Sequence, residues 1–279
     1  MRVLSVTEIA AEVERLFVEA NTDISGGTLE RLQAAIVDER SPAGREVLCE
    51  LLENARIAKE EALPVCQDTG LAVLFIEVGQ DVRLTGGGLT EAVTEGVRNA
   101  YVKGFLRKSC CDPFSRKNTG DNTPPIVHTS IVDGERVRIV VFPKGGGSEN
   151  YSEARMLLPS QGMAGVRDFV LEMVRKAGPN PCPPITVGVG IGGNFETSAL
   201  LSKEALMVPF GKRSGDHEVA AFEENILAEI NRLGIGPGGY GGSVTALDVH
   251  IKVLPCHIAS FPVAVNIQCH AHRIKETTI

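Results

Sequence analysis

The chain has no tryptophan, few aromatic residues and no concentration of positive charge. Aromatic residues make up 5% of its 279 residues, which argues against stacking platforms for nucleic-acid bases. The formal net charge is −7 at pH 7, and no run of Lys and Arg stands out. Binding to a phosphate backbone needs clustered positive charge, so we expect no nucleic-acid partner.

Long apolar stretches are also missing. Residues 1–9 contain no basic region followed by an apolar stretch, so the sequence predicts no signal peptide. No apolar run reaches the roughly 20 residues that cross a bilayer, and we expect no membrane association. These absences together predict a cytoplasmic protein.

The seven cysteines include no Cys-x-x-Cys pair, so a structural zinc site is not indicated. An odd number of cysteines without a secretory signal argues against a disulfide framework. The thiols could be inert buried groups, reactive groups or metal ligands. A zinc site built from His257, His270 and His272 would lack the compact spacing typical of such sites.

The apolar pattern predicts an α/β fold. Through residue 60, apolar residues recur every three or four positions, which indicates a helical N-terminal layer. Beyond Pro64, short apolar runs such as 71–78 predict buried strands that alternate with helical patterns. We expect a mixed α/β part with short buried strands after the helical layer. The expected domain spans residues 1–279 and could include a helical subdomain at about 1–62.

The pattern places further elements along the rest of the chain. Strands are expected at 126–131, 136–142, 184–190, 244–253 and 261–268, and helices at 89–106, 163–176, 198–207 and 218–233. The Asp133-Gly134 dipeptide predicts a turn that joins the first two of these strands. Residues 234–242 are rich in glycine and could form either a linker or a binding loop.

Two polar segments look unlike simple scaffold. Residues 64–70 place a thiol, an amide, a carboxylate and a hydroxyl just before a buried strand, although a polar turn would use the same residues. Arg107 and Lys108 follow a predicted helix and precede a long polar loop at 118–125. A guanidinium group matches a carboxylate in bidentate fashion, whereas the alternative is a cation that complements the helix dipole.

Two further segments combine glycine or proline with reactive groups. Residues 144–150 contain three glycines that could direct backbone N–H groups at an anion, but they lack the pattern of a phosphate-binding loop. Cys182 stands between Pro181 and Pro183, and such a rigid position suits a metal ligand. The GVGIGG stretch at 188–193 lacks the spacing of a dinucleotide-binding fingerprint.

Taken together, seven segments in order resemble the class I fumarase family. The resemblance is greatest to the α subunits of its two-subunit members, which include L-tartrate dehydratase, and it runs over nearly the whole chain. The segments are VCQDTG at 65–70, GGLTEAV at 87–93, LRKS at 106–109, NTGDNTPP at 118–125, KGGGSEN at 144–150, CPPITVGVGIGG at 182–193 and HIASFPVAVNIQC at 257–269.

The resemblance implies a [4Fe-4S] cluster that is held by three cysteines and has one open iron. Carried over to this chain, the ligands are Cys66, Cys182 and Cys269. An open iron can bind a substrate oxygen and act as a Lewis acid, whereas a fully ligated cluster transfers electrons. The other four cysteines match no ligand position and are expected to be structural thiols.

The resemblance also assigns roles within the site. It implies catalytic roles for Asp68 and His257, a carboxylate contact for Arg107, and further substrate contacts for Gln67 and for the backbone at Gly145 and Gly146. From the residues alone, Asp68 could instead be a turn or cap residue, and His257 a satisfied core histidine.

We therefore expect the α subunit of a hydro-lyase that acts on a small dicarboxylate. The expected reaction is fumarate hydration to L-malate, with the general base on a separate β subunit, in an α2β2 assembly whose α chain is inactive alone. The alternatives are an L(+)-tartrate dehydratase α subunit, a non-catalytic iron–sulfur sensor, and a cofactor-free α/β binding protein.

Overall fold

The computed structural model describes all 279 residues, and internal contacts divide the chain into two compact units. The first unit comprises Met1–Ser25, Asn54–Gly146 and Arg273–Ile279, and the second comprises Gly26–Glu53 and Gly147–His272. Neither unit coincides with residues 1–62, where the sequence suggested a helical subdomain. The chain passes between the units several times, so each unit is assembled from distant segments.

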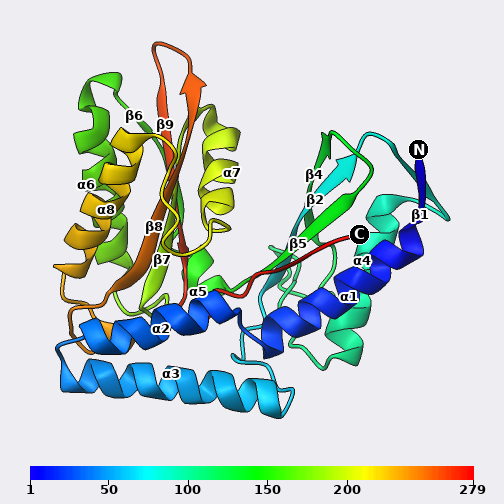
Figure 1. Cartoon of the computed structure of the whole chain (residues 1–279), viewed down its shortest axis with the longest axis horizontal. Helices are drawn as coiled ribbons and strands as arrows, with labels where there is room; N and C mark the ends of the chain where they lie inside the picture. Colours follow the sequence, from blue (N-terminus) through cyan, green and yellow to red (C-terminus); the bar gives the residue numbers. More distant parts are fainter. The chain divides into compact units, whose positions relative to one another are not determined.

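The N-terminal part is helical, as the sequence predicted (Figure 1). A short strand, β1 (Arg2–Ser5), precedes α1 (Val6–Thr22), α2 (Gly26–Asp38) and α3 (Pro42–Glu60). The Ser5 hydroxyl accepts the N–H of Thr7 at 3.2 Å and so caps the first turn of α1. Helix α1 belongs to the first unit and α2 to the second, while α3 begins in the second unit and ends in the first.

The first unit is built on a four-stranded sheet in the order β10-β5-β2-β4. Its strands are β2 (Leu71–Gly79), β4 (Ile126–Val132), β5 (Val137–Lys144) and β10 (Lys275–Thr278), and β3 (Val82–Thr85) pairs separately with β1. The apolar faces of α1 and α4 (Leu89–Lys103) form one core with β2 and β5. The two helices pack closely, since a Cβ on Gly96 would lie 2.5 Å from the carbonyl oxygen of Ala10.

Strands β4 and β5 both form where the sequence placed them, but they do not pair with each other across the Asp133-Gly134 turn. Strand β2 lies between them, parallel to β4 and antiparallel to β5. The run from Ala72 to Ile76 is buried on both faces of the sheet. An apolar strand of this kind is favoured in a central position, where both of its edges can form ladders.

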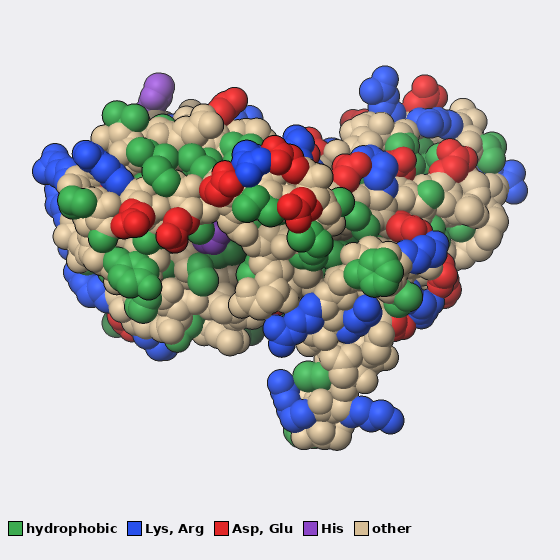
Figure 2. Space-filling model, turned by 90° about the horizontal axis from the view of Figure 1, so that it is seen from below, with side chains coloured by type: hydrophobic (Ala, Val, Ile, Leu, Met, Phe, Trp, Pro, Cys, Tyr) green, Lys and Arg blue, Asp and Glu red, His purple; other side chains and the backbone are tan.

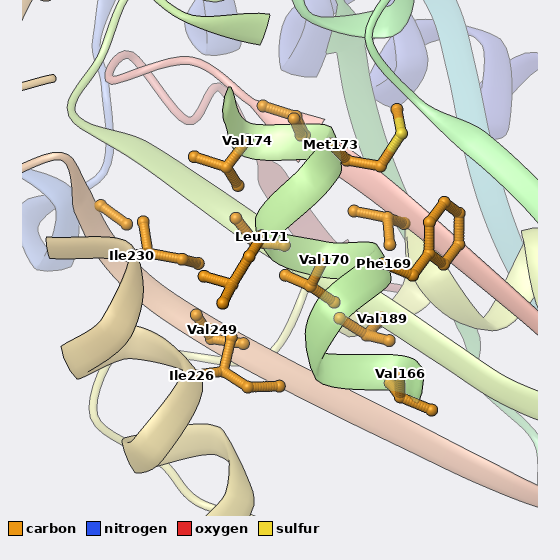
Figure 3. Close-up of a cluster of buried hydrophobic side chains, with 14 of the residues drawn as sticks. Val166, Phe169, Val170, Leu171, Met173, Val174, Val189, Ile226, Ile230 and Val249 are labelled. Carbon is orange, nitrogen blue, oxygen red and sulfur yellow. The ribbon is translucent and has the colours of Figure 1, made fainter. Parts of the chain in front are cut away.

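The second unit contains another four-stranded sheet, in the order β6-β9-β7-β8. These strands are β6 (Glu153–Leu157), β7 (Ile185–Gly193), β8 (Ala246–Cys256) and β9 (Phe261–Gln268). Helices α6 (Gly162–Ala177) and α8 (His217–Asn231) cover one face, and α7 (Phe195–Ala205) lies on the other (Figure 1). Figure 3 shows Val170 and Leu171 of α6 facing Ile226 of α8 in the apolar core.

The glycines of the GVGIGG stretch serve helix packing. A Cβ on Gly188 would lie 2.1 Å from the carbonyl oxygen of Ser202, and one on Gly190 would lie 2.1 Å from that of Ser198. Both serines belong to α7, so the helix backbone rests almost directly on β7. A side chain at either position would push the helix away from the sheet.

Among the helices, none combines the length and apolar character that crossing a bilayer requires. On the face shown in Figure 2, Lys and Arg side chains mix with Asp and Glu in the upper part of the view, whereas Lys and Arg predominate in the lower part.

A buried carboxylate organises the second unit at the junction of α2 and α3. The side chain of Glu39 is completely buried, and its Oε1 accepts N–H groups from Ser41 at 2.7 Å and Ser243 at 2.9 Å. Its Oε2 accepts the N–H of Val244 at 2.8 Å. Burial alone would raise the pKa of Glu39, but the N–H donors of Ser41, Ser243, Val244 and Arg40 outweigh this effect and lower it.

We expect the Glu39→Gln substitution to lower the free energy of unfolding by about 1–3 kcal/mol at pH 7, because an amide places an N–H₂ group against backbone donors. A lowered folded-state pKa means that the charged form contributes stability above the unfolded pKa. That contribution is lost as the pH falls through the folded pKa. Urea unfolding at several pH values should therefore show the two proteins converging in acid. The exposed Glu50 of α3 offers the control Glu50→Gln, and equal effects of the two substitutions would contradict this role.

Candidate active site

The predicted site residues divide between the two units. Six belong to the first unit and three to the second. The structure contains no group of three or more His, Cys, Asp or Glu side chains arranged to hold a metal ion, so the three-thiol ligand set stays a prediction. The residues of the first unit are Cys66, Gln67, Asp68, Arg107, Gly145 and Gly146, and those of the second are Cys182, His257 and Cys269.

The turn at residues 65–70 leads directly into β2 and holds Cys66 half-buried. Its first residue, Val65, makes two hydrogen bonds of 2.8 Å through its backbone. The N–H of Val65 donates to the carbonyl of Asn21, and the carbonyl of Val65 accepts a hydrogen bond from Nδ2 of Asn54. The sulfur of Cys66 accepts the N–H of Asp68 at 3.4 Å, and the thiol lies 3.4 Å from Oε1 of the exposed Gln67. These two contacts hold the Cys66 side chain against its own turn.

Asp68 is bonded through both of its carboxylate oxygens to backbone N–H groups. Oδ1 accepts from Gly70 at 3.0 Å, and Oδ2 accepts from Gly146 at 2.8 Å. The structure therefore gives Asp68 the turn-stabilising role that the sequence left open as an alternative. The Gly146 N–H, which we expected to face the substrate, is bonded to Asp68 here. The catalytic role of Asp68 stays a prediction.

Arg107 lies beside this turn and has a guanidinium group without a partner in the chain. Its carbonyl accepts the hydroxyl of Thr69 at 2.7 Å, while its side chain is exposed. Helix α4 ends at Lys103, so Arg107 is outside the last helical turn and does not complement the helix dipole. An exposed, unpaired guanidinium group can bind an anionic ligand.

Asn122 is a buried residue of this site that the sequence did not single out. Its Oδ1 accepts the N–H groups of Ser109 at 2.7 Å and Cys110 at 2.9 Å, and its Nδ2 donates to the carbonyl of Gly70 at 3.1 Å. It thereby joins the loop after Arg107 to the thiol turn. Asn122 has a φ of +61°, in the left-handed region that Asn tolerates better than most residues. The Gly-Asp-Asn sequence could have signalled such a turn.

In the second unit, the segments that carry Cys182 and Cys269 are hydrogen-bonded to each other. His270 donates its N–H to the carbonyl of Cys182 at 3.3 Å, just before β7 and just after β9. Cys182 is exposed and Cys269 is half-buried. Two of the three predicted ligand segments therefore lie side by side.

Cys182 also has an unusual backbone conformation. Its φ is +54°, a left-handed value that is strained for a residue with a side chain. Such strain costs about 1–3 kcal/mol, persists only where the surroundings impose it, and is concentrated at functional sites. The backbone here is held by the bond from the Cys182 N–H to the carbonyl of Pro179 at 3.0 Å.

The glycine-rich residues 234–242 support the Cys182 turn and are not a linker. Gly238 donates its N–H to the carbonyl of Pro183 at 2.8 Å, and Gly236 donates to Oγ1 of Thr245 at 3.1 Å. A Cβ on Gly239 would lie 2.3 Å from Cβ of Pro179, and Gly239 has a φ of +81°. Pro179 and Pro183 therefore pack against the glycines of this loop.

His257 lies far from the other two residues of its unit. It follows β8 at an exposed turn, where its Nδ1 accepts the N–H of Ala259 at 3.1 Å, so it is not a core histidine. Cys182 precedes the start of β7, whereas the opposite end of β7 pairs with Cys256 at Gly193. Nine extended residues span about 26 Å. The structure therefore does not bring His257 beside these two thiols within this unit, and its catalytic role stays a prediction.

Comparison with known proteins identifies the family. The family described as fumarate hydratase (Fumerase) matches residues 10–278. A chain from Methanocaldococcus jannaschii with the provisional name L(+)-tartrate dehydratase subunit alpha is 40% identical over 273 residues, which cover 95% of each chain. The L(+)-tartrate dehydratase subunit alpha of Escherichia coli (strain K12) is 35% identical over 272 residues, covering 96% of this chain and 88% of the relative.

The matching family and the names of the relatives are those of hydro-lyases, because hydratases and dehydratases add or remove water. The chain belongs to the fumarate hydratase (Fumerase) family, as the seven sequence segments predicted. The names of its relatives agree better with the tartrate alternative than with fumarate hydratase.

We expect the Gly239→Ala substitution to destabilise the second unit by more than about 1 kcal/mol, because the new methyl group would meet Pro179 at a left-handed position. Hydrogen exchange at Cys182 and Gly238 should speed up together, since one contact holds both. The matched control is Gly215→Ala, where a Cβ would meet nothing within 4 Å. Similar urea unfolding curves for the two variants would show that the loop does not support the Cys182 turn.

Proposed function

We propose that this chain is the α subunit of an iron–sulfur hydro-lyase whose substrate is L(+)-tartrate. The observation that carries the proposal is the similarity to L(+)-tartrate dehydratase α subunits over nearly the full length of the chain. The sequence favoured fumarate hydration, and the names of the relatives favour its alternative. Fumarate remains the second candidate, because the family description names fumarate hydratase.

We infer that Cys66, Cys182 and Cys269 hold a [4Fe-4S] cluster with one open iron. The donor set fits such a group, since none of the three thiols forms a disulfide and each is at least partly exposed. The segments of Cys182 and Cys269 are bonded to each other. When bound, the cluster would supply a Lewis acid for the substrate hydroxyl.

The residues of this chain would bind and orient the substrate. The unpaired guanidinium group of Arg107 is suited to one carboxylate of a dicarboxylic acid, and its charge would stabilise the anion formed when the neighbouring carbon loses a proton. The exposed amide of Gln67 and the backbone at Gly145 would complete the contacts, while Asp68 holds its turn beside them. We propose that the general base comes from a β subunit, in an α2β2 assembly.

Replacing any one of Cys66, Cys182 or Cys269 with Ser should abolish the cluster. A hydroxyl is a poor ligand for iron in a site built for thiolates. Anaerobic reconstitution followed by iron and sulfide analysis and electron paramagnetic resonance would measure the loss. Cys49→Ser is the control, because Cys49 lies on α3 and matches no ligand position. Iron retained in all three variants would remove the cluster from the proposal and leave the family assignment intact.

Together with its β subunit, the chain should prefer L(+)-tartrate to L-malate by about 100-fold or more in kcat/KM. The two acids differ by one hydroxyl, and a site that pairs this hydroxyl leaves polar groups unpaired with the acid that lacks it. The measurement is an anaerobic dehydration assay of the co-expressed subunits with both substrates and with D-tartrate. A preference for malate would establish the fumarate candidate. Turnover by the iron-loaded chain alone would show that no partner is needed.

A further inference from the structure

Arg273 is the largest fully buried side chain of the protein, with 1% of its surface exposed. It follows β9 in sequence, and no role for it came from the sequence patterns. Its Nη1 donates to Oδ1 of Asn21 at 2.8 Å and to the carbonyl of Asp68 at 2.6 Å, while its Nε is buried without a partner. Burying a cation costs free energy unless the cation is well paired, so a buried arginine indicates a specific role.

Through its two acceptors, Arg273 is connected to the backbone on both sides of Cys66. Asn21, at the end of α1, is itself buried, and its Nδ2 donates to the carbonyl of Phe17 at 2.9 Å. Its carbonyl accepts the N–H of Val65 at 2.8 Å. The residues on either side of Cys66 and Gln67 are thus tied to the same residue of α1, Val65 directly and Asp68 through Arg273.

The guanidinium group of Arg273 also lies close to the Asp68 carboxylate, although no ion pair joins the two groups. A Cβ on Gly145 would lie 3.2 Å from Oδ2 of Asp68 and 3.4 Å from Nη2 of Arg273, so both groups border the same point. The carboxylate oxygens are bonded to the N–H groups of Gly70 and Gly146, and no ion pair joins them to Arg273. The guanidinium group therefore keeps unused donors at this point.

We propose that Arg273 is a positioning residue that fixes the Cys66 thiol and the Asp68 carboxylate. Its consequence for the cluster rests on the proposed function, whereas its hold on the turn does not. One nitrogen of Arg273 serves two acceptors, and its planar group reaches both from a fixed direction. A lysine ammonium group could donate a full hydrogen bond to one acceptor and a weaker one to the other. An apolar side chain could donate to neither.

The first arm of the test needs no cluster. Hydrogen exchange of residues 65–70 in the iron-free chain should speed up about tenfold or more in Arg273→Met, since a charge-assisted hydrogen bond is lost, and less in Arg273→Lys. Arg138→Met is the control, because Arg138 of the same unit is half-exposed on β5 and paired with Glu77 and Glu276. Parent-like exchange in Arg273→Met would overturn the proposal. If that variant does not fold, parent-like exchange in Arg273→Lys would do the same.

The second arm uses the complete enzyme with its β subunit, reconstituted anaerobically. Arg273→Lys should alter the electron paramagnetic resonance signal and lower kcat with little change in KM, because Arg273 is 1% exposed and acts through the turn. An unchanged signal and kcat in this variant would overturn the link to the cluster. Iron binding that survives Cys66→Ser would instead refute the proposed ligand set, and the exchange experiment would still decide the role of Arg273.

Discussion

The site of the first unit depends on one constraint, which is that the buried polar groups of the turn before β2 must find partners. Tyr101 donates its hydroxyl to the carbonyl of Thr69 at 2.8 Å, and Asn122 donates to that of Gly70. Asp68 accepts two N–H groups, and Arg273 donates to its carbonyl. Unpaired polar groups in a core cost about as much as a lost hydrogen bond, so these partners specify a single conformation. That conformation sets the place of Cys66.

In the second unit, glycines take the place of polar side chains in fixing the turn that carries a thiol. Gly188 and Gly190 let α7 rest on β7, and Gly239 lets its loop rest on Pro179. Through these contacts the strained backbone of Cys182 is held against the segment of Cys269. Both units therefore present their thiols on turns fixed by packed backbone, which would suit the ligand role proposed for them.

Local sequence patterns predicted most elements of this fold, because the spacing of apolar residues is set by the geometry of a single helix or strand. They did not predict features that depend on contacts between residues far apart in sequence. Strand β2 separates β4 from β5, although the turn between those two strands has the composition of a hairpin turn. The sequence indicated no role for Arg273, because its partner Asn21 is 252 residues away along the chain.

The exposed features of the site distinguish the enzyme from its alternatives. A cofactor-free binding protein would give no reason for Cys182 to keep a left-handed backbone beside the Cys269 segment, since a glycine there would remove the strain. An iron–sulfur sensor would need the thiols but not an exposed, unpaired guanidinium group such as that of Arg107, whose own carbonyl is bonded to the turn of Cys66. Such a group suits the proposed binding of a dicarboxylate substrate.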